Sequence, residues 1–122
     1  MNIKLANFDK DIELKADIAT CLEFTLVWAD AVDDTASLVR INAAAIGVAL
    51  DSYSILPSYK PERDKILNYG YKVLQRLLEK NVGLQDIYNA GTKILSSMSG
   101  KLPQRDEIED KKDFFHSPKQ ET

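Results

Sequence analysis

The stretch from 61 to 80 constrains the fold most, because it carries the apolar pattern of one helix face. Large aliphatic side chains recur there at the three- and four-residue spacing of an α-helix, with charged and amide side chains at most other positions. Pro61 suits a first helical turn, and Gly83 lies where such a helix would end. Other helices must cover the stripe, so the stretch predicts a helical bundle. Its aliphatic residues are Ile66, Leu67, Val73, Leu74, Leu77 and Leu78.

Two further stretches extend the predicted bundle. The stretch 36–50 is rich in alanine, and its small residues four apart let another helix approach closely. We therefore expect it to be the central buried helix. The stretch 84–98 again has apolar residues at helical spacing. Gly70 and Gly91, inside predicted helices, indicate close helix crossings; Tyr69 and Tyr71 flank Gly70, so we expect one ring in the core and one at the surface.

The stretch 17–31 is also predicted to be a helix, with Asp17 at its start. Its aromatic and β-branched residues have strand propensity, but its length favours a helix. The apolar residues cover a wide face. Ile18, Leu22, Leu26 and Ala29 fall on one side, and Cys21, Phe24, Val27 and Trp28 widen it.

The two ends of the chain differ from the middle. Residues 1–16 hold two short alternating pieces, Ile3 to Leu5 and Ile12 to Leu14, joined by a polar, turn-prone connection. This pattern favours either a short β-hairpin or an extended arm. Residues 103–122 predict a charged helix followed by a flexible tail. We therefore expect a mainly α, bundle-like single domain of four or five helices. Residues 1–102 form its helical body with an N-terminal arm (1–16), and 103–122 form the C-terminal helix and tail.

Composition limits what the protein can bind. A net charge of −3 gives no basic footprint for nucleic acid. Cys21 is the only cysteine, so neither an internal disulfide nor a cysteine-based metal site can form. The longest fully apolar run covers residues 43–50, far short of the roughly 20 residues that cross a bilayer. No charged start leads into an apolar signal core, so we expect a cytoplasmic protein that binds no membrane.

Three closely spaced carboxylates are a candidate metal site. Asp30, Asp33 and Asp34 can supply oxygens to a divalent cation, as in all-helical hydrolases that hold magnesium between facing helices. The dense Glu-x-x-Glu elements of those enzymes are absent. Helix-end and capping roles therefore explain the three aspartates better, and the metal-dependent hydrolase is kept only as an alternative.

No catalytic, cofactor or metal residue is predicted elsewhere. His116 is the only histidine and lies beside the tail, without an orienting group or a nearby nucleophile. Cys21 falls on an expected core face with no histidine close in sequence, which favours packing over nucleophilic chemistry. We therefore expect a protein that is not an enzyme.

The C-terminal stretch carries the candidate partner-binding residues Ile108, Phe114 and Phe115. Two phenylalanines are unusually apolar for the end of a charged helix. One interpretation is that Ile108 and Phe115, seven residues apart, dock on the bundle while Phe114 packs at its edge. The other is that the rings insert into a partner or a second copy, as an amphipathic helix fills a groove.

Scattered fragments of the chain give a resemblance to a known class of proteins. In style the chain resembles small all-helical proteins from the structural modules of tailed bacteriophages and prophages, tail assembly chaperones among them. The resemblance implies binding of virion structural proteins during assembly, in the host cytoplasm or the virion, without chemistry. It transfers no functional residue. The fragments are Arg40 to Gly47, Leu56-Pro57, Tyr69-Gly70, Leu77-Leu78, Leu102-Pro103 and Asp113 to Phe115.

The sequence therefore predicts a non-enzymatic protein-binding or assembly module, with protein partners or self-association and no cofactor. The alternatives are the metal-dependent hydrolase and a small cytoplasmic regulatory binding protein.

Overall fold

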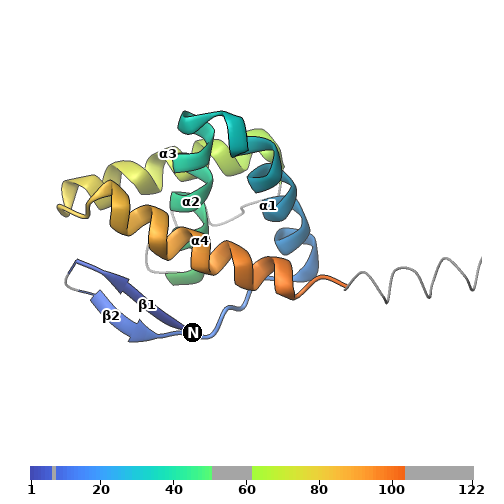
Figure 1. Ribbon diagram of the computed structural model, residues 1–122, viewed down its shortest axis with the longest axis horizontal. Helices are drawn as coiled ribbons and strands as arrows, with labels where there is room; N and C mark the ends of the chain where they lie inside the picture. Colours follow the sequence, from blue (N-terminus) through green and yellow to red (C-terminus); the bar gives the residue numbers. More distant parts are fainter. Residues whose placement is uncertain (7, 51–61, 104–122) are drawn as a thin grey trace, which may run out of the picture.

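The computed structural model describes residues 1–6, 8–50 and 62–103. A two-stranded hairpin, β1 (Asn2–Leu5) and β2 (Phe8–Asp11), precedes four helices (Figure 1). The helices are α1 (Ile18–Asp30), α2 (Thr35–Leu50), α3 (Arg63–Glu79) and α4 (Leu84–Gly100), with a 3-10 turn, η1 (Ala31–Asp33), between the first two. The prediction of a mainly helical domain is confirmed. The C-terminal helix predicted over 104–115 lies outside the described residues.

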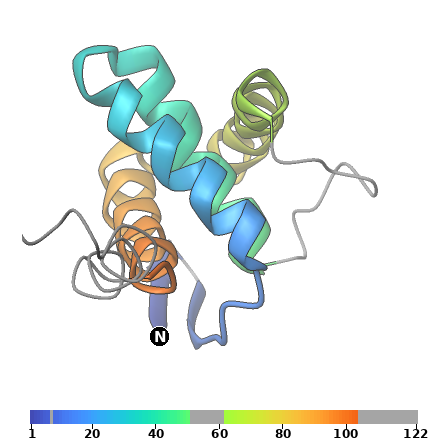
Figure 2. The same ribbon diagram turned by 90° about the vertical axis from the view of Figure 1, so that its right-hand side faces the viewer.

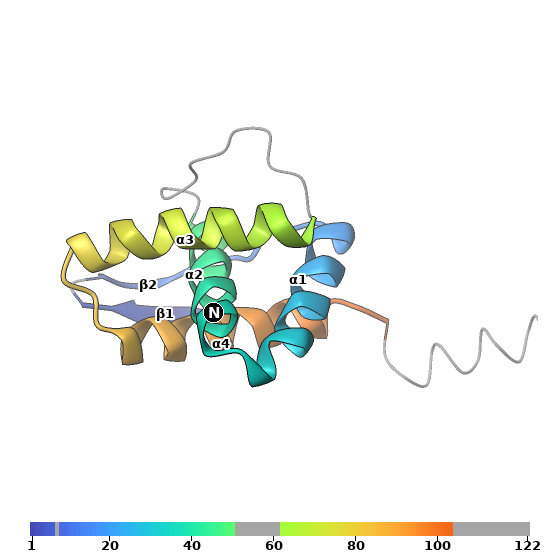
Figure 3. The ribbon, with the colours of Figure 1, turned by 90° about the horizontal axis from the view of Figure 1, so that it is seen from above.

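The molecule is arranged around α2. Every residue from Ile41 to Gly47 is buried, and α2 makes its most extensive contacts with α3 and α4. Seen from above, α3 and α4 run in opposite directions on either side of α2 (Figure 3). The stretch 36–50 was thus correctly predicted to be the central helix. The stripe of α3, from which the sequence predicts a bundle, is buried at Ile66, Val73 and Leu77, and the most extensive contact of α3 is with α2.

Two glycines set how closely the outer helices approach α2. A Cβ added at Gly70 of α3 would lie 2.8 Å from the carbonyl carbon of Arg40. One added at Gly91 of α4 would lie 2.6 Å from the Cβ of Asn42. Real Cβ atoms essentially never come that close to their neighbours. The two glycines are therefore points of close helix crossing, as predicted, and Tyr69 is buried while Tyr71 is exposed.

The N-terminal residues form a hairpin, which decides between the two predicted alternatives. The strands are antiparallel, with Ile3 opposite Lys10 and Leu5 opposite Phe8. The expected second piece, Ile12 to Leu14, was wrong as a strand, because β2 ends at Asp11. The β2 sequence FDKD has no apolar alternation, since this strand is largely exposed and forms by pairing with β1.

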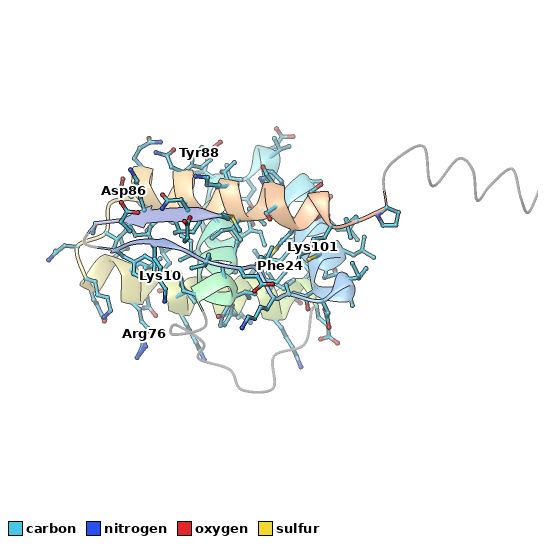
Figure 4. All side chains as sticks on the ribbon, turned by 90° about the horizontal axis from the view of Figure 1, so that it is seen from below. Lys10, Phe24, Arg76, Asp86, Tyr88 and Lys101 are labelled. Atoms are coloured by element: carbon cyan, nitrogen blue, oxygen red, sulfur yellow. The ribbon has the colours of Figure 1, made fainter. Side chains whose placement is uncertain are left out.

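The hairpin and the following segment lie against α4 (Figure 4). Ile3 and Leu5 of β1 are buried. Further along, the ammonium group of Lys101, at the end of α4, donates hydrogen bonds to the carbonyl oxygens of Leu14 (2.7 Å) and Ala16 (3.4 Å). These bonds join the last turn of α4 to the residues that lead into α1.

No helix within the described ranges is long and apolar enough to cross a membrane.

Candidate protein-docking surface on α1

Helix α1 begins at a capping aspartate and lies across one end of the bundle. The backbone N–H of Thr20 donates a 2.8 Å hydrogen bond to the Asp17 carboxylate, which satisfies one of the free N–H groups of the first turn. Viewed from that end, α1 is the element nearest the viewer (Figure 2). One of its sides therefore packs on the bundle and the other faces away from it.

The inner side of α1 is formed by Cys21, Phe24 and Val27, all buried. At about 100° per residue, the outer side is then formed by Ile18, Leu22, Leu26 and Ala29, which we call the outer face of α1. Its three large side chains are 54%, 46% and 50% exposed, in that order. The prediction of one wide apolar face on α1 was therefore wrong: Cys21, Phe24 and Val27 lie on the core side, and Ile18, Leu22 and Leu26 lie on the opposite side.

An apolar hollow adjoins the outer face at the C-terminal end of α1. Its volume is about 430 Å³. The rings of Trp28 and Tyr88 and the side chain of Leu38 form part of its wall, so α1, α2 and α4 all contribute. Ala29 and Val32 belong to the wall as well, and Val32 is 71% exposed. The outer face therefore continues into a concave apolar site.

The surroundings of the outer face are acidic. The sequence from 17 to 34 contains no lysine or arginine. Among the described residues, one ion pair reaches this stretch: the Arg63 guanidinium of α3 lies 3.3 Å from an Asp30 carboxylate oxygen, and the Asp30 side chain stays 72% exposed. The resulting surface combines apolar side chains with a negative border. The acidic residues in the stretch are Asp17, Glu23, Asp30, Asp33 and Asp34.

Hydrogen bonds hold two of these carboxylates in their charged form. The backbone N–H of Thr20 keeps the pKa of Asp17 below its ordinary value. The Ser37 hydroxyl donates to Asp34 at 2.7 Å and, with the Ser37 N–H, lowers the pKa of that carboxyl. Both groups are therefore anionic at neutral pH, and both act at helix starts.

Two of the three aspartates considered as a metal site have separate structural partners. Asp30 pairs with Arg63, and Asp34 bonds to Ser37 before the start of α2. Over residues 1–6, 8–50 and 62–103, no three acidic, histidine or cysteine side chains are grouped as a metal ion requires. The hydrogen bond from Ser37 supports the interpretation of Asp34 as a helix cap.

Of the other candidate residues, Cys21 lies within the described part of the chain. Cys21 is buried, its thiol lies 3.8 Å from the Ala16 carbonyl oxygen to which it donates, and burial raises its pKa. This is a packed thiol and a poor nucleophile at neutral pH. The predicted partner-binding residues Ile108, Phe114 and Phe115, and His116, lie outside the described residues, so their roles stay predictions.

Sequence reasoning missed the outer face for an identifiable reason. A helix that is apolar on most of its circumference has no polar side to mark the surface. The available signal was the excess of large apolar residues in 18–32 over what one buried side of a short helix can use. The border of acids without any base was a second signal.

Comparison with known protein families, with curated proteins and with solved structures gives no match.

Proposed function

We propose that this protein is a non-enzymatic protein-binding module that engages its partner through the outer face of α1. The observation that carries the proposal is the row of Ile18, Leu22 and Leu26, three large aliphatic side chains about half exposed on one helix side. Scattered exposed apolar residues are normal, but a contiguous row beside an apolar hollow is typical of an interaction site. Binding would remove this area from water, which is the main driving force for association.

The geometry gives no comparable support to an enzyme. Thr25 and Tyr88 bring hydroxyl groups to the wall of the apolar hollow, and no acid, histidine, lysine or arginine is among the residues that line it. The metal-dependent hydrolase has no observation in its favour within the described residues, where Asp30 pairs with Arg63 and Asp34 bonds to Ser37.

The narrower form of the proposal places the module in phage or prophage morphogenesis, as a tail assembly protein that binds virion structural proteins. It rests on the sequence resemblance alone. The proposed contribution of Ile108, Phe114 and Phe115 as a second contact rests on their apolar character in a charged stretch. Neither is needed for binding through α1.

Two matched positions test the proposal. Leu22 on α1 and Leu78 on α3 are both 46% exposed, so the two leucines present similar areas on different surfaces. A photo-crosslinking residue at 22 or at 78 of the full chain, in cells that express it naturally, reports what each surface touches. We expect a specific crosslink from position 22 and none from 78. Equal crosslinking from both positions, or none from 22, would contradict the proposal.

A further inference from the structure

We infer that the element which docks on α1 is a basic amphipathic helix of a partner protein. This inference rests on the proposed function and adds the chemistry of the partner. Three observations support it: the shape of the outer face, the sign of its border, and the hollow at its end.

The shape fits a helix. Ile18, Leu22 and Leu26 follow one another at four-residue spacing, so they form a straight ridge along α1. From Ile18 to Ala29 the ridge is about 17 Å long at 1.5 Å per residue, which is three helical turns. A partner helix presents anchors at the same spacing, so ridges of one helix fit grooves of the other along this whole length.

The border selects the charge of that helix. The outer face is bordered by acids at both ends, Asp17 and Asp30, and by half-buried Glu23 along its length. Arg63 of α3 pairs with Asp30, whose side chain stays 72% exposed, and α1 itself carries no base. Lysine and arginine flanking an apolar stripe would meet these carboxylates across the interface. Such complementarity steers association and disfavours acidic partners.

The same border argues against two other occupants. In a dimer with α1 antiparallel to its copy, the acidic borders of the two helices would meet, and the one Arg63 in each copy would not balance their five acids. A parallel pair would set like residues side by side. The chain's own residues 104–122 carry four lysine or arginine against six acidic residues, so they too are net acidic. A basic helix from another protein is the occupant that removes the repulsion.

The hollow accepts one large anchor side chain. Trp28, Leu38 and Tyr88 present apolar surface around a volume of about 430 Å³, at the end where Ala29 closes the ridge. A branched aliphatic or aromatic residue at one end of the partner's stripe fills it. Anchors of this kind carry most of the binding energy in helix recognition.

The test uses a labelled peptide of about 18 residues, long enough to form a helix, with leucines on one face and lysines on the other. A second peptide has the same leucine positions with glutamate in place of lysine. Binding to the full-length protein is followed by fluorescence anisotropy. We expect the lysine peptide to bind, more weakly as salt rises from about 50 mM to about 500 mM, and the glutamate peptide not to bind.

The variant Leu22→Asp separates docking from simple charge attraction. It removes an apolar contact but adds a negative charge, so non-specific attraction of the lysine peptide would rise. Docking on the outer face predicts the opposite, an affinity lowered about tenfold or more, because burial of one leucine side chain is lost. Leu78→Asp adds the same charge at an equally exposed position and leaves the affinity within about twofold.

Several results would overturn the inference. They are equal affinity of Leu22→Asp and the unchanged chain for the lysine peptide, binding of the glutamate peptide, and dimerisation that Leu22→Asp abolishes. So would lysine-peptide binding that appears only after Phe114 and Phe115 are replaced by alanine, since the chain's own end would then fill the site. A crosslink from position 22 to a partner without a basic helix would overturn this inference and leave the proposed function standing.

Discussion

The hydroxyl of Thr92 on α4 donates a 3.1 Å hydrogen bond to the side-chain oxygen of Asn42 on α2. Asn42 is fully buried, and its amide nitrogen donates a second bond, 2.8 Å long, to the carbonyl oxygen of Leu38. Within the described ranges, Asn42 is the only buried side chain with an amide or a charged group. The pair lies where Gly91 brings α4 against α2, so it fixes how the two helices cross.

We predict that Thr92→Val lowers the free energy of unfolding by about 1–3 kcal/mol, because it leaves the buried Asn42 oxygen without its partner. Asn42→Ala should cost at least as much, since it removes both bonds and opens a cavity. Urea denaturation measures both, and the double variant should lose less than the sum. Asn89→Ala, at an exposed position of α4, is the control and should change stability by no more than about 0.5 kcal/mol. Additive losses would show that the two side chains do not act together.

Gly70→Ala and Gly91→Ala should each destabilise the fold by about 1–3 kcal/mol, although alanine is the better helix former. The added methyl group would overlap α2 at Arg40 or at Asn42. Gly100→Ala is the matched control, because no atom lies within 4 Å of a Cβ built there. Thermal melting distinguishes them: the first two variants should melt lower and the control should not. A Gly70→Ala protein as stable as the unchanged chain would mean that α2 and α3 can separate without loss.

The Asp17 cap predicts a pH dependence. Its pKa is lowered in the folded protein from the ordinary 3.8, so its stabilising effect is complete well above pH 3.8 and is lost as pH falls through the lower folded value. Asp17→Ala should therefore lower the urea midpoint at pH 7, and the difference from the unchanged chain should shrink below pH 3.8. Asp17→Asn, which caps without titrating, should keep the same midpoint difference at both pH values. A constant Asp17→Ala difference from pH 7 to pH 2.5 would contradict the assignment.

Lys101→Met should loosen the segment between the hairpin and α1. It removes the two hydrogen bonds to the Leu14 and Ala16 carbonyl oxygens while keeping much of the aliphatic stem. We expect a loss of about 1 kcal/mol, since the ammonium group is partly exposed. Hydrogen exchange should quicken in residues 12–20 before it changes in α2. Lys93→Met, at an exposed position of the same helix, should leave both measurements unchanged.

The two phenylalanines of the C-terminal stretch give a last prediction. If Phe114 and Phe115 serve a partner, replacing both by alanine should barely move the melting temperature. A fall of several degrees would show that they stabilise the chain's own fold, with Phe115 docked on the bundle and Phe114 packed at its edge.

The parts of this fold that sequence predicts are those where local pattern and burial agree. In α3 the polar and apolar positions alternate at helical spacing, so Ile66 and Leu77 could be assigned to the core. In α2 the run of small residues indicated close packing, and the structure buries it.

The parts that sequence could not predict depend on tertiary contacts. Strand β2 has no strand pattern of its own and forms because β1 pairs with it. In α1 the choice between Phe24 and Leu22 as the buried residue is made by the position of α2 and α4, since both are large and apolar. The candidate docking surface is the side that this choice leaves exposed, so it emerges only with the structure.

The placement of α2 between α3 and α4 has a consequence for how the chain can be divided. Neither flanking helix has the other as its main neighbour. α2 makes the most extensive contacts with both, while α1 contacts both less extensively and β1 contacts α4. Two polypeptides, residues 1–50 and 62–103, should each remain largely unstructured alone and fold on mixing. The two polypeptides can therefore serve as a split reporter, because they reassemble only when α2 packs between α3 and α4.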